Sequence, residues 1–70
     1  MRDINRIEPF LEKVAELWKK YPDYRFGQMI SNINFQGRDM FYLEDDDFLI
    51  YLENHISSII RYEKLKSINN

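Results

Sequence analysis

Four consecutive carboxylates, Glu44, Asp45, Asp46 and Asp47, are the side chains that come closest to a binding constellation. Carboxylate oxygens bind hard cations, but calcium loops space their ligands at alternating positions around a glycine, and this run has neither feature. Acidic residues also suit the first turn of a helix, where they complement the helix dipole. We therefore expect the run to begin a helix with Asp45 as its N-cap, and we predict no metal and no cofactor. An acidic docking patch formed by Glu44, Asp46 and Asp47 is the alternative.

His55 is the only histidine, and the chain has no cysteine. On a helix, Tyr51 and Ser58 lie four and three residues from it, so either hydroxyl could touch the imidazole. A catalytic triad also requires an orienting carboxylate and an oxyanion site, and no motif supplies them. No glycine-rich phosphate loop is present either. We predict that the protein is not an enzyme and that His55 lies at the surface or the edge of the core.

Arg25 and Arg38 lie among aromatic residues. Such a pattern can stack nucleobases, or it can place arginine stems over a small aromatic core. Packing is favoured here, because the net charge of −2 does not suit a general binder of phosphates. The alternative function is a small regulator that contacts nucleic acid through Arg25, Arg38 and the basic tail of Arg61, Lys64 and Lys66.

The five tyrosines are more than a 70-residue domain is expected to bury. Exposed tyrosines beside isoleucines are typical of protein interfaces. Tyr51, Ile59 and Tyr62 fall in the third predicted helix, which has apolar residues around more of its circumference than one core face requires. We therefore predict a protein-interaction module that self-associates or binds a partner through these residues, with the acidic run steering a basic partner.

The elements that would position these residues are three helices. Apolar residues at spacings of three and four predict a first helix over about 5–20, with Asp3 or Asn5 as cap. Pro9 predicts a bend or a 3₁₀ start, and Pro22 ends the helix. Asp23 should cap the second helix.

The second helix is expected over about 24–34 and the third from the acidic run to about 66. Gly27 inside the second helix indicates close approach of a neighbouring helix. Residues 34–39 form a loop with Gly37 at a positive φ, and residues 40–43 form an extended segment that inserts its aromatic rings into the core. The predicted core comprises Ile7, Leu11, Val14, Trp18, Phe26, Ile30, Ile33, Phe41, Leu49, Leu52 and Ile56.

These elements predict an all-α, compact three-helix domain over residues 1–70, with a short middle helix and an aromatic-rich connection before the third. We expect residues 1–4 and 67–70 to fray. No apolar run reaches the ~20 residues that span a bilayer, and the first residues lack the apolar stretch of a signal peptide. The predicted location is the cytoplasm, without a membrane or a small-molecule substrate as partner.

Three features form a recognisable pattern. They are Trp18, four residues before Pro22-Asp23, then Gln28 on the following helix, and the acidic pair Asp45-Asp46 that opens the third helix. The pattern, over about residues 7–55, resembles the YihD-like family of short bacterial proteins. It is also similar to small proteins of Firmicute genomes and prophages. The resemblance implies a small helical fold and a bacterial or prophage origin. It implies no activity and no functional residues.

Overall fold

The computed structural model describes the backbone of residues 3–68 and the side chains of residues 3–66. Over this range the chain forms three α-helices and two 3₁₀ helices, which confirms the all-α, three-helix fold. In chain order they are η1 (Ile4–Arg6), α1 (Ile7–Lys19), α2 (Phe26–Asn32), η2 (Met40–Tyr42) and α3 (Asp45–Ile68). The fraying expected at residues 1–2 and 69–70 lies outside the described residues, whereas Ile4 belongs to η1 and residues 67–68 belong to α3.

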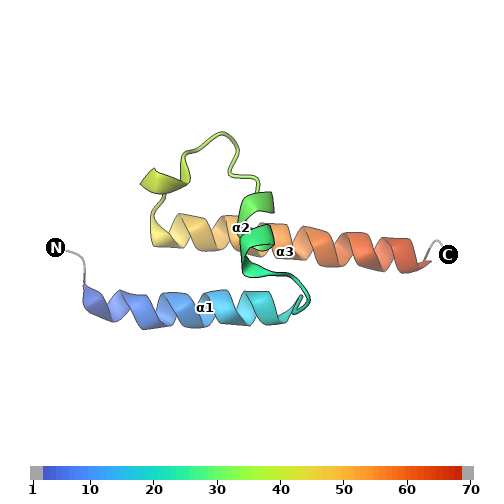
Figure 1. The fold of residues 1–70 in the computed structure, drawn as a ribbon, viewed down its shortest axis with the longest axis horizontal. Coiled ribbons are helices and arrows are strands. Elements are labelled where there is room, and N and C mark those ends of the chain that lie inside the picture. Colours follow the sequence, from blue (N-terminus) through green and yellow to red (C-terminus); the bar gives the residue numbers. More distant parts are fainter. Residues whose placement is uncertain (1–2, 69–70) are drawn as a thin grey trace.

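Helices α1 and α3 lie side by side and run in the same direction, while the short α2 crosses steeply beside them (Figure 1). Because two parallel helices cannot be joined by a tight turn, residues 20–44 form a long crossover that contains α2 and η2. The C-terminal half of α3 extends beyond the other helices. The molecule is therefore elongated, with extents of 53 × 26 × 17 Å.

The start of the first helix is a 3₁₀ turn, as Pro9 predicts. The Asp3 carboxylate accepts a hydrogen bond from the Asn5 backbone N–H at 2.9 Å and caps η1. Pro9 is the third residue of α1, within the first turn, where a missing N–H leaves no helical hydrogen bond unmade. The 3₁₀ turn thus lets the chain enter α1 without a break at the proline.

The turn after α1 corrects the expected cap of the second helix. The Tyr24 backbone N–H donates to the Tyr21 carbonyl at 3.2 Å, which places Pro22 and Asp23 at the centre of a separate turn. Helix α2 consequently begins at Phe26 rather than Tyr24, and its N-cap is Arg25, without a side-chain cap. The prediction that Asp23 caps the second helix was wrong, because Pro22 and Asp23 are the central residues of this turn and the helix begins three residues after Asp23.

Gly27 was also interpreted wrongly. A Cβ built on Gly27 would meet no atom within 4 Å, so no neighbouring helix approaches the backbone there. Gly37 does need its conformational freedom: it has φ +82° and follows Gln36 at φ +57° in the turn that the Arg38 N–H closes on the Phe35 carbonyl. The loop over residues 34–39 is therefore confirmed.

The segment before α3 differs from the prediction. Residues 40–42 form η2, whose cap is the Asp39 carboxylate accepting from the Phe41 backbone N–H at 3.0 Å. Phe41 and Tyr42 are 82% and 75% exposed and pack against each other, with ring centroids 4.9 Å apart. The aromatic rings of this segment thus do not insert into the core, because the capped 3₁₀ turn directs them outwards.

Asp45 is the first residue of helix α3 and not its N-cap, since an N-cap precedes the first helical residue. The Phe48 backbone N–H donates to the Glu44 carbonyl at 3.0 Å, so Glu44 precedes the first turn and Asp45, Asp46 and Asp47 lie within it. The helix continues without interruption to Ile68, through the two serines at 57 and 58. Three carboxylates in the first turn complement the helix dipole as expected.

The core lies mainly between the facing sides of α1 and α3, with α2 covering one side. Among residues 3–66, the buried side chains are Val14, Leu17, Met29, Ile33, Leu52 and Ile56. Four of these belong to the predicted core, and Leu17 and Met29 join them. Trp18, Ile30 and Leu49 pack against this cluster but are only partly buried.

Four predicted core residues are exposed instead: Ile7, Leu11, Phe26 and Phe41. On α1 the reason is geometric. The apolar residues of this helix cover two adjacent faces, and α3 covers only the face that carries Phe10, Val14 and Leu17. Assigning both faces to one core overestimated what a single neighbouring helix can bury.

Candidate interaction surface

The predicted acidic patch is divided by contacts within the chain. Arg6 of η1 forms an ion pair with Asp45, and a guanidinium nitrogen of Arg38 in the loop lies 3.4 Å from a carboxylate oxygen of Asp47. Asp46 and Glu44 are exposed. Within the described residues, no three acidic or histidine side chains gather closely enough to hold a metal ion. The Asp45 and Asp47 carboxylates thus tie the start of α3 to η1 and to the loop.

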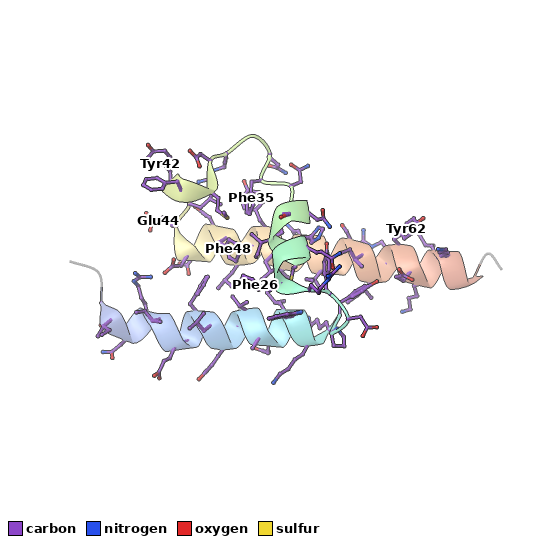
Figure 2. The ribbon with its side chains drawn as sticks, viewed as in Figure 1. Phe26, Phe35, Tyr42, Glu44, Phe48 and Tyr62 are labelled. Atoms are coloured by element: carbon purple, nitrogen blue, oxygen red, sulfur yellow. The ribbon has the colours of Figure 1, made fainter. Side chains whose placement is uncertain are left out.

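Tyr51 belongs to an aromatic chain inside the fold. The centroid of the Phe35 ring lies 6.1 Å from that of Phe48 (Figure 2). The Tyr51 ring lies 5.5 Å from Phe35, and the Phe10 ring of α1 lies 5.8 Å from Phe48. The Arg38 guanidinium lies 5.9 Å from the Tyr51 ring centroid. The Tyr51 hydroxyl and the Asp47 carboxylate both raise the pKa of Arg38. One face of Tyr51 is therefore occupied by its own chain.

Ile59 and Tyr62 lie farther along α3, apart from Tyr51. They line a shallow open groove together with Tyr21, Tyr24 and His55, and Tyr62 is 64% exposed on the part of α3 beyond α2 (Figure 2). The Tyr21 hydroxyl donates to the Glu63 carboxylate at 3.3 Å, and this carboxylate raises the pKa of Tyr21. The three predicted interface residues of α3 therefore do not form one continuous patch.

A chain of hydrogen bonds orients His55 at the edge of this groove. The Asn32 amide donates to the Tyr24 hydroxyl at 2.9 Å, which leaves that hydroxyl free to donate to His55 Nε2, also at 2.9 Å. This geometry fits a neutral imidazole, and partial burial lowers the pKa of His55 below its ordinary value. His55 thus lies at the edge of the core, as expected.

The basic residues of the alternative function are separated along the chain. Arg25 donates to the Gln28 side chain at 3.4 Å at the start of α2, and the charge of Arg38 is compensated by Asp47. Arg61, Lys64 and Lys66 are exposed on the last turns of α3. A carboxylate beside Arg38 reduces the positive potential that a phosphate would meet there.

A continuous apolar surface lies on α1. We define the α1 stripe as Ile4, Ile7, Leu11, Ala15 and Trp18, extended by Phe26, whose ring lies 5.5 Å from the Trp18 ring. At about 100° per residue, the α1 members lie within about 40° of Leu11 around the helix axis. Ile4 and Leu11 are 76% and 56% exposed. The stripe ends in an apolar depression lined by Ala15, Trp18, Lys19 and Pro22.

Trp18 fixes the end of the stripe. Its indole Nε1 donates to the Tyr24 carbonyl at 2.6 Å, across the turn that joins α1 to α2. The ring is only partly buried, so its free face lines the depression. Trp18 therefore holds the angle between two helices while still presenting apolar surface to solvent.

Three charged side chains flank the stripe on the same side: Glu8, Lys19 and Glu12, the last about 100° from Leu11 around the axis. Glu8 and Lys19 lie about 60° and 80° from Leu11 around the axis, at opposite ends of α1 and about 16 Å apart along it. Both side chains are exposed, and neither contributes to an ion pair within the described residues. The stripe is therefore bordered by a negative charge near its N-terminal end and a positive charge near its C-terminal end.

The total accessible surface is larger than that of a compact monomer of the same mass. The chain exposes 5899 Å², whereas a compact monomer of 8.6 kDa exposes about 4,700 Å². The stripe, the tip of η2 and the outer end of α3 together contain large apolar side chains that a larger domain would bury.

No protein-family model, curated protein or solved structure matches this chain. The resemblance to the YihD-like proteins therefore stays a prediction. Within the described residues, no helix is both long enough and apolar enough to cross a membrane.

Sequence reasoning missed the α1 stripe as a surface, although a signal was present. The first helix carries two apolar series, one through Phe10, Val14 and Leu17 and another through Leu11 and the rest of the stripe. A helix with one neighbour on that side can bury only one of these series. The excess of apolar residues was recognised on the third helix and overlooked on the first.

Proposed function

We propose that the protein is a non-enzymatic protein-interaction module and that the α1 stripe is its contact surface. The observation that carries this proposal is the exposure of Ile4, Ile7, Leu11 and Phe26 along one continuous face. Monomeric proteins rarely expose such a patch unless it is used, and aromatic anchors such as Trp18 are enriched where interfaces concentrate their binding energy. The bacterial or prophage origin and the cytoplasmic location accompany this proposal as expectations from the sequence.

The stripe is better suited to contact than the predicted residues of α3. Tyr51 is partly covered by Phe35 and Arg38, and it is separate from the groove that holds Ile59 and Tyr62. Apart from Ile4 of η1 and Phe26 of α2, the α1 stripe instead lies on the thirteen residues of the regular helix α1, whose backbone needs no rearrangement on binding. The exposed Asp46 within the acidic run would then steer an approaching partner rather than form the contact.

Site-specific photo-crosslinking in cells tests the proposal. A benzophenone side chain in place of Leu11 should form an adduct with a protein, because it lies in the centre of the stripe. The matched control places the same group at Lys13, an exposed position about 160° around α1 from Leu11. Adducts at position 11 that are absent at position 13 support the proposal. Equal labelling at both positions, or none at position 11, overturns it.

A further inference from the structure

The α1 stripe is self-complementary under a two-fold rotation. If a second copy lies antiparallel on α1, with the axis midway between residues 13 and 14, residue i faces residue 27 − i of the partner. Glu8 then faces Lys19 of the second copy, and Lys19 faces its Glu8. Both charges lie on the same side of the stripe, and an axis perpendicular to two antiparallel helices brings the same sides together. One rotation therefore forms two ion pairs, and it also brings the two copies of Glu12 to within about 4.5 Å of each other along the helices, a like-charge contact between the two pairs.

The shapes agree with the same arrangement. In this register, Ile7 of one copy meets the depression between Ala15 and Pro22 of the other, and Leu11 lies opposite the small Ala15. Large side chains thus face a hollow or a small residue, as packed helix pairs require. In a parallel arrangement, Glu8 would instead face the side of α1 that α3 already covers, and no lysine would lie opposite it.

We propose that the partner of the α1 stripe is a second copy of this chain, bound antiparallel along α1 with reciprocal Glu8–Lys19 ion pairs. This inference rests on the proposed function and names the partner. Stable complexes bury about 1,200–2,000 Å² in total, so each copy would have to bury about 600–1,000 Å² along the stripe and the surface beside it. The apolar contact provides the affinity and the charges select the direction and register.

Charge exchange between two variants tests the register. Glu8→Lys places two lysines opposite each other in both halves of the dimer, and Lys19→Glu does the same with two glutamates. Each variant alone should self-associate about tenfold more weakly, measured by sedimentation or by light scattering during size exclusion. An equimolar mixture restores both opposite-charge pairs and should regain the wild-type association. Each substitution also opposes the helix dipole, but loss of α1 could not be rescued by mixing the same two chains.

Introduced cysteines test the direction, since the chain has no cysteine of its own. Ala15→Cys lies close to the proposed axis and should form a disulfide-linked dimer under mild oxidation. Ile4→Cys is the control: the two copies of residue 4 would lie about 28 Å apart in the antiparallel dimer, but side by side in a parallel one. Linkage through position 15 and not through position 4 is the expected result.

Three outcomes overturn the homodimer: a wild-type protein that stays monomeric up to roughly 1 mM, a mixture of charge variants that does not recover, or linkage through position 4. These failures are distinguishable from failure of the proposed function. If Leu11 crosslinks to a protein of another mass while the purified chain stays monomeric, the interaction module stands and the second copy is replaced by another partner.

Discussion

Leu11 and Leu17 are the same residue type in the same helix, yet Leu11 is 56% exposed and Leu17 only 1%. The difference is a rotation of about 120° around α1, which turns Leu17 towards α3 and Leu11 towards solvent. At the residue scale, then, one helix separates residues that fold the protein from residues that are free to bind.

Alanine substitutions should separate these two roles. Leu17→Ala removes a fully buried side chain and should lower the free energy of unfolding by about 2–5 kcal/mol, enough to unfold much of a small domain. Leu11→Ala should change it by less than about 1 kcal/mol, because half of the side chain is already in water. Urea unfolding at a concentration where the protein is monomeric measures both. Equal losses would mean that the stripe is part of the core.

His55 should make folding sensitive to pH. Burial lowers its pKa in the folded state below the ordinary value of 6.5, so the unfolded chain binds the proton more readily. The stabilising effect of the neutral ring is therefore complete above about pH 6.5 and is lost as the pH falls through the lowered pKa. Unfolding free energies should decrease from pH 7.5 towards pH 5.5, before the carboxylates titrate.

His55→Gln is the control for this dependence, because glutamine can still accept from the Tyr24 hydroxyl but does not titrate. The variant should show a flat profile over the same range. A slope that persists in His55→Gln would assign the pH dependence to another group.

At the scale of elements, the two glycines have opposite roles. Gly27 lies in α2 with open space where a Cβ would be, so Gly27→Ala should stabilise the protein by up to about 1 kcal/mol through helix propensity. Gly37 has φ +82°, which alanine adopts only with strain, so Gly37→Ala should destabilise it by about 1 kcal/mol. Thermal melts of the two variants, compared with the wild type, check both signs. A loss of stability in Gly27→Ala would indicate a contact that the described structure lacks.

The elements that sequence predicted best are those defined by local chemistry. The 3₁₀ start near Pro9, the end of the first helix before Pro22 and the loop at Gly37 all follow from backbone restrictions on single residues. The failures required knowledge of neighbours. Nothing local shows that the capped turn at Asp39 directs Phe41 outwards, or that α3 covers one apolar face of α1 and leaves Leu11 uncovered.

The candidate site was predictable only in kind. An excess of apolar and aromatic residues correctly indicated more apolar surface than one small core can hold, but its position depended on which helices pack together. Tyr51 illustrates the difficulty. Its ring contacts Phe35 and Arg38, which lie thirteen to sixteen residues earlier in a loop, and only the folded path of that loop brings them to Tyr51.

For the whole molecule, a small core and a large exposed stripe link folding to association. If two copies cover each other's stripes, the folded state is stabilised by mass action, and the midpoint of thermal unfolding should rise with protein concentration. Leu11→Ser should abolish the rise while leaving the midpoint at low concentration nearly unchanged. Differential scanning calorimetry over a roughly hundredfold range of protein concentration measures this rise in the midpoint, because the midpoint depends on the logarithm of the concentration. A midpoint independent of concentration in the wild type would contradict self-association.

The parallel alignment of α1 and α3 also governs the order in which the chain can fold. Contacts such as Arg6 with Asp45 and Tyr21 with Glu63 join residues about forty positions apart, so the packing of α1 on α3 depends on contacts distant in the sequence. The apolar face of α1 that packs on α3 stays uncovered until α3 has been made. The face of α1 that carries Leu17 can therefore be buried only after α3 is available, and we expect the core to form late in folding rather than helix by helix.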